Sequence, residues 1–131
     1  MMRSIKYASP PIFIAAVIFY LCCLATSDDM PSISWPYTDK VVHFLMYLGL
    51  SGVASFWYIY GEKGLVNVRK LIIYAFILPI LYGGLIEILQ HRYFEGRSGD
   101  CFDFLADVLG SLAALPLALY FRRILINRES Q

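Results

Sequence analysis

A few ionisable and amide side chains interrupt a chain that is otherwise apolar. They fall in pairs three or four residues apart: Lys40 and His43, Glu87 and Gln90, and Asp103 and Asp107. Residues at these spacings share one face of a helix, so the members of each pair point the same way. An imidazole beside carboxyl groups can transfer protons, and ammonium or guanidinium groups can bind an anionic group such as phosphate.

We interpret these side chains as parts of one polar site. Its predicted ligand-binding residues are Lys40, His43, Tyr47, Glu87, Gln90, Arg97, Asp103 and Asp107. Acid–base catalysis would fall to His43, Glu87 or Asp107, but no serine elbow or phosphate-binding glycine loop accompanies them. Whether the protein is an enzyme therefore stays open.

Metal binding is the other chemistry that these residue types allow. Imidazole and carboxylate ligands come from His43, Glu87, Asp103 and Asp107. Their spacing specifies no metal, and the basic members of the same site would repel a cation. We therefore expect no metal and no other cofactor. The cysteines, Cys22, Cys23 and Cys101, fit neither a disulfide framework nor a zinc motif.

The segments that must position this site have the composition of a membrane protein. Of 131 residues, 59% are hydrophobic and only 16% are charged, whereas charged residues make up about 25% of an ordinary soluble domain. This composition argues against a soluble single-domain enzyme. The net charge of +1 argues against a nucleic-acid partner.

Uncharged runs of 21 residues lie at 7–27 and 41–61, each long enough to cross about 30 Å of hydrocarbon. Two shorter runs, 71–86 and 108–121, must take in Glu87 and Asp107 to span. We expect an all-α, polytopic membrane protein that forms a single domain over 1–131. Its four transmembrane helices form a small bundle, with spans at about 7–27, 41–60, 71–89 and 104–124.

Helical periodicity predicts which faces turn inward. On the second span, Lys40, His43, Tyr47, Ser51 and Ala54 share one face, while Leu45, Leu48 and Phe56 face lipid. The third span aligns Gly83, Glu87 and Gln90, and the fourth aligns Asp103, Asp107, Gly110, Ser111, Ala114 and Ala118. An acid in hydrocarbon is costly, so Glu87 and Asp107 need partners. The candidate bases are Lys40, His43, Arg92 and Arg97.

Structural roles remain open for the same residues. Asp39 and Asp103 could cap helices. His43 could make an interhelical hydrogen bond and nothing more, and Glu87 and Asp107 could form structural ion pairs.

The distribution of basic residues predicts the orientation. The two termini and the 61–70 connection hold 8 of the 11 Lys and Arg residues. The positive-inside rule therefore places both termini in the cytoplasm and the polar cluster outside. A cleaved signal peptide is the alternative for the first apolar run, since Ala25-Thr26-Ser27 resembles a cleavage site.

A family resemblance accompanies these residues. The stretch Asp39–Tyr47 and the later Glu87-Ile88-Leu89-Gln90, Arg97, Asp103 and Asp107-Val108-Leu109-Gly110 resemble the VanZ-like family of small integral membrane proteins. The resemblance extends to about Ala114, where an alanine replaces a family glycine, and Asp107 stands in place of a family asparagine. It implies a bacterial envelope role, as in the namesake, which lowers susceptibility to teicoplanin.

Three functions fit these observations. The first is an envelope protein of the bacterial inner membrane that binds a lipid or envelope-precursor headgroup, with Lys40 and Arg97 on phosphate. The second is a membrane enzyme acting on an amphiphilic or lipid-linked substrate, with His43 as base. The third is an accessory subunit whose polar cluster is a structural latch, packed in a homo-oligomer or against another membrane protein.

Overall fold

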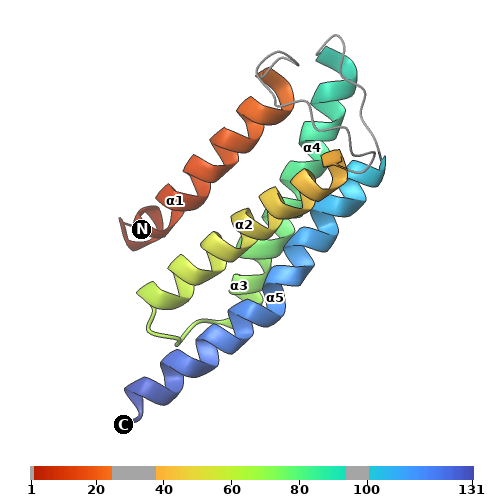
Figure 1. The fold of residues 1–131 in the computed structure, drawn as a ribbon. Helices are drawn as coiled ribbons and strands as arrows, with labels where there is room; N and C mark the ends of the chain where they lie inside the picture. The colour runs from red at the N-terminus through yellow and green to blue at the C-terminus, as the bar shows by residue number, and fades with distance from the viewer. Residues whose placement is uncertain (1, 25–37, 94–100) are drawn as a thin grey trace.

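A computed structural model of the protein describes residues 2–24, 38–93 and 101–131 (Figure 1). These residues are helical apart from the turn at 62–67 and the last two residues. The helix α1 (Met2–Phe19) continues into the π-helical turn η1 (Tyr20–Leu24), and α2 covers Thr38–Gly61. The segments α3 (Val68–Ile72), η2 (Ile73–Ile77) and α4 (Leu78–Tyr93) follow one another without a break, and α5 covers Cys101–Glu129.

Three of these helical stretches are long and apolar enough to cross a bilayer: Lys40–Gly61, Val68–Tyr93 and Cys101–Glu129. A shorter apolar helix covers Ser9–Cys23. The outer surface is rich in exposed leucine, for example Leu81 at 63% and Leu117 at 64% exposure. Large apolar surfaces of this kind are stable against lipid and unfavourable in water. The predicted all-α architecture, a small four-helix membrane bundle, is confirmed.

The π-helical turn η2 precedes a proline. Pro79 has no N–H, so it cannot donate the usual hydrogen bond to the carbonyl of Ala75, which lies within η2. Single π turns absorb such interruptions without ending a helix. The long helix from Val68 to Tyr93 therefore stays continuous.

The turn at 62–67 connects α2 to α3 through a left-handed glycine. Gly64 has φ +83°, and its N–H donates to the Ile59 carbonyl over 2.9 Å, which closes α2 as glycines commonly do. Asn67 then caps α3, because its Oδ1 accepts from the Arg69 N–H at 2.9 Å. Arg122 of α5 donates from Nε to the Gly64 carbonyl at 3.1 Å, which fixes the turn against α5.

The helices α2 and α5 form the most extensive pair in the bundle. They approach closely at Gly110, where a Cβ atom would collide with the Phe44 carbonyl group. In Figure 1, the beginning of α2, the end of α4 and the beginning of α5 lie at one end of the bundle, and the chain termini lie at the other. We call the first of these the polar end, after the residues described below.

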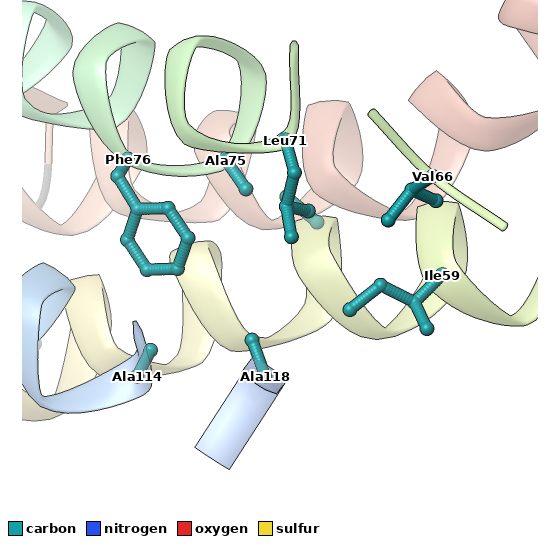
Figure 2. Close-up of a cluster of buried hydrophobic side chains, with 8 residues drawn as sticks. Ile59, Val66, Leu71, Ala75, Phe76, Ala114 and Ala118 are labelled. Carbon is teal, nitrogen blue, oxygen red and sulfur yellow. The ribbon is translucent and has the colours of Figure 1, made fainter. Parts of the chain in front are cut away.

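The main hydrophobic core lies away from the polar end. Figure 2 shows side chains of α3 and η2 pointing toward α2 and α5. The buried residues of this cluster are Ala54, Ile59, Val66, Leu71, Ala75, Phe76, Ala114 and Ala118. A second cluster joins α1 and η1 to α2 and α4 through Ile18, Cys22, Cys23, Tyr47, Leu50 and Ile86.

The predicted inward faces are buried with few exceptions. His43, Tyr47, Ser51 and Ala54 are buried on α2, and the stripes predicted for α4 and α5 are buried too, with Asp103 half-buried. The lipid-facing prediction is wrong for Leu48, which packs against the main core. Leu48 lies on the α2 face that α5 covers, since its backbone N is next to Gly110.

Candidate functional site

Five polar side chains from three helices converge at the polar end. Lys40 and His43 come from α2, Glu87 from α4, and Asp103 and Asp107 from α5. The side chains of the group differ in burial: that of Lys40 is 34% exposed, and that of Asp107 is fully buried. The site therefore has an accessible mouth at Lys40 and Asp103 and a closed floor at Asp107.

The best-defined interaction joins His43 to Asp107. The His43 Nδ1 lies 2.8 Å from Asp107 Oδ1. A carboxylate only accepts hydrogen bonds, so we assign the proton to Nδ1. In a neutral ring this leaves Nε2 as an acceptor. The pair therefore fixes both the orientation and the tautomer of His43.

The free edge of His43 faces Asp103. The His43 Nε2 lies 3.8 Å from Asp103 Oδ2, and Lys40 Nζ lies 3.5 Å from Asp103 Oδ1. Asp103 thus directs one oxygen toward the imidazole and the other toward the ammonium. The spacing of Lys40 and His43 on α2, and of Asp103 and Asp107 on α5, brings both pairs to the same helix interface.

Glu87 joins the group from the third helix. It is 9% exposed, and ligand atoms of His43, Glu87 and Asp103 all lie within 4.8 Å of one another. No metal was expected from the sequence, because the spacing specifies none and the basic residues of the site would repel a cation. The fold nevertheless brings one imidazole and two carboxylates together.

A seam of buried polar atoms continues inward from Asp107. Tyr47 Oη, Ser51 Oγ, Asp107 Oδ2 and Ser111 Oγ are buried and have no hydrogen-bond partner among the described residues. Gly83 lets α4 approach this seam, since a Cβ there would lie 2.9 Å from Asp107 Oδ2. Tyr47 and Ser111 therefore belong to the floor of the site. Ser111 was predicted only as part of an inward stripe.

Two side chains of α4 reach the first helix instead. Gln90 donates to the Cys22 carbonyl over 2.7 Å, and Tyr82 donates to the Ala15 carbonyl over 2.6 Å. Gln90 therefore joins helices, and ligand binding by it remains a prediction. The contact of Tyr82 with the first helix was not predicted, because the spacing of Tyr82 from the acidic residues does not indicate it. Its hydroxyl in an apolar run was the available clue.

Not every predicted base enters the site. Arg92 and His91 are exposed at the end of α4. Arg97 lies outside the described residues, as does the side chain of Asp39. Among the described candidates, Asp107 pairs with His43 and Asp103 pairs with Lys40.

An apolar groove of about 240 Å³ lies between α1, α2 and the η2–α4 segment. Its walls include Pro11, Ala15, Leu50, Leu78 and Tyr82. A lining of this kind fits a hydrocarbon chain. The groove is therefore distinct in character from the polar end.

Comparison with protein-family models, curated proteins and solved structures gives no match for this chain.

Proposed function

We propose that the protein is a VanZ-like envelope protein of the bacterial inner membrane, with both termini in the cytoplasm and the polar end facing outward. Its site binds the polar headgroup of a membrane lipid or envelope precursor. Through that binding it affects susceptibility to glycopeptides such as teicoplanin. The proposal concerns a binding protein and needs no covalent chemistry.

The observation that carries this proposal is the convergence of charged side chains in an apolar bundle. Charged side chains within the membrane cost several kcal/mol unless they are paired or hydrated, so each is a candidate functional residue. Here they gather at one end, graded from the part-exposed Lys40 to the buried Asp107. A site with an accessible mouth suits a ligand that arrives from the membrane surface.

The two cations assigned to the ligand are Lys40 and Arg97. Lys40 lies at the mouth, and its present partner Asp103 is itself part-exposed. A phosphate can replace that carboxylate as the partner of the ammonium. The apolar groove beside α1 offers a surface of matching chemistry for the hydrocarbon part of an amphiphile.

Binding can be tested on the purified protein. A fluorescent short-chain analogue of an anionic phospholipid should bind the protein, and vesicles containing that phospholipid should compete with it. Lys40→Ala and Arg97→Ala should each weaken binding of the analogue several-fold. Added salt should weaken it too, because the contact is ionic. Lys63→Ala, in the turn that follows the far end of α2, is the control. Equal binding by Lys40→Ala, Arg97→Ala and the control would contradict the headgroup role.

The cellular role has its own test. Wild-type protein expressed in a teicoplanin-sensitive bacterium should raise tolerance, and His43→Ala, Glu87→Ala and Arg97→Ala should lose it at equal membrane levels. Glu62→Gln, distant from the polar end, should behave as wild type. Equal tolerance in every variant would leave the polar cluster as a structural latch only.

The His43–Asp107 pair favours a second candidate, a hydrolase of an amphiphilic ester. A carboxylate on Nδ1 prepares Nε2 to take a proton from water. The hydroxide would add to the ester carbon or phosphorus, and the proton would pass to the leaving alkoxide. Loss of product formation in His43→Gln with headgroup binding intact would support catalysis. Unchanged substrate after prolonged incubation with wild type would exclude it for that substrate.

A further inference from the structure

We infer that the polar end holds a divalent transition-metal ion, bound by His43 Nε2 and by carboxylate oxygens of Glu87 and Asp103. Asp107 is the positioning residue behind His43. The proposal goes beyond headgroup binding and stands without it, because the ion is recognised by these side chains alone.

The ligand geometry comes first. A ring nitrogen of His43 and carboxylate oxygens of Glu87 and Asp103 lie within 4.8 Å of one another, and His43 Nε2 is 3.8 Å from Asp103 Oδ2. Zinc bonds of about 2.0–2.2 Å in a tetrahedral site separate ligand atoms by roughly 3.5 Å. The proposal requires rotation of the Glu87 and Asp103 side chains to close the remaining difference.

The arrangement of Asp107 is the second, independent observation. Asp107 is fully buried and contacts the ring nitrogen of His43 that the ion would not use. Metal-binding histidines almost always donate their other N–H to a carboxylate, a carbonyl or water, which fixes the ring and raises its basicity. A chance cluster of surface acids has no such support.

The charges also favour a cation. The carboxyl groups of Glu87 and Asp103 lie beside the imidazole of His43, and carboxylate with imidazole is a ligand set that divalent metal ions use in proteins. In surroundings of low dielectric, carboxylates attract a nearby cation strongly.

Lys40 does not occupy the proposed position. Its Nζ lies on the Oδ1 side of Asp103 at 3.5 Å, whereas His43 Nε2 faces Oδ2. The ammonium therefore lies beside the other oxygen of Asp103 and would reduce metal affinity by charge repulsion. Lys40→Met should accordingly tighten metal binding, since it removes a positive charge beside the ion.

The ligand types select the class of metal. Imidazole with carboxylates suits zinc, manganese or iron, and the nitrogen ligand disfavours magnesium and calcium. With three protein ligands, a fourth position stays available for water or an oxygen of a bound headgroup. An ion with an available position could therefore bridge the acids of this site to an anionic ligand.

The test measures metal directly. Full-length protein, purified in detergent and stripped with a chelator, is titrated with Zn²⁺ by calorimetry. Metal content after dialysis should be one ion per chain. Binding should vanish in His43→Ala, Glu87→Gln and Asp103→Asn, and Asp107→Asn should weaken it about 10–100-fold. Glu62→Gln is the matched acid control and should bind as wild type.

The exposed thiol of Cys101 lies two residues from Asp103 and needs its own control. Cys101→Ser should keep the ion. Co²⁺ bound to wild type should show visible d–d absorption without thiolate charge-transfer bands, a result that does not depend on any variant folding. Absence of stoichiometric metal in wild type, loss of metal in Cys101→Ser, or thiolate bands in the cobalt spectrum would each overturn the proposal. None of these outcomes bears on headgroup binding, which vesicle competition measures separately.

Discussion

At the scale of single residues, the two ring nitrogens of His43 face two different carboxylates. Asp107 engages Nδ1 of His43 at 2.8 Å, and Asp103 lies 3.8 Å from Nε2, so the ring is held between two carboxylates on one helix. One edge of the imidazole is fixed and the other stays available for a proton, a metal or a ligand. The same contacts serve any of the chemistries considered above.

The first prediction concerns this pair. His43→Ala and Asp107→Asn should be non-additive in the free energy of unfolding, with a coupling of about 0.5–3 kcal/mol, because each removes the partner of the other. The measurement is loss of helical circular dichroism during titration with a denaturing detergent. Asp107→Asn combined with Arg122→Ala, about 22 Å further along the same helix, is the control and should be additive. Additivity of the first pair would mean that the contact contributes nothing to stability.

Sequence reasoning placed His43, Glu87 and Asp107 in one predicted site but did not pair them. Spacing fixes which face of a helix a side chain occupies, and the structure agrees for these three. The rotation and depth of one helix against another decide which acid meets which base. Those depend on close contacts such as Gly110 on Phe44, which no spacing along the chain reveals.

At the scale of helices, small residues set how near the polar side chains can come. Gly110 allows α5 to touch the backbone of α2, and Gly83 allows α4 to reach Asp107. The first helix is attached differently, through the hydrogen bonds from Tyr82 and Gln90 to its carbonyls. Such interhelical bonds contribute about 0.6 kcal/mol each on average in membranes. The sequence predicted the small-residue stripes but not these attachments.

The second prediction tests the close approach. Gly110→Ala should destabilise the bundle by about 1–3 kcal/mol, because the new methyl group forces α2 and α5 apart. The same separation should weaken the binding of any ligand at the polar end. Gly49→Ala is the matched control, since nothing lies within 4 Å of a Cβ there. Thermal unfolding in detergent should place Gly110→Ala clearly below Gly49→Ala, and equal midpoints would contradict the contact.

At the scale of the whole molecule, the fold is an apolar bundle whose candidate site lies at one end. Composition and run lengths were sufficient to predict the helices, because a membrane requires long apolar segments whose backbone groups are satisfied internally. The third helix extends further than its apolar run, from Val68 to Tyr93. Its polar termini lie outside the apolar window from which the sequence prediction was made.

The last prediction tests which way this bundle faces. Cys101 is exposed at the beginning of α5, whereas Cys22 and Cys23 are 4% and 5% exposed. If the polar end is extracytoplasmic, a membrane-impermeant maleimide added to spheroplasts should label Cys101, and Cys101→Ser should abolish the signal. Lys63→Cys in the Cys101→Ser background reports on the exposed turn at the opposite end. It should be labelled only after permeabilisation, because the positive-inside rule places its basic neighbours in the cytoplasm. The reverse pattern would turn the polar end toward the cytoplasm, and an envelope ligand would then be unable to reach Lys40.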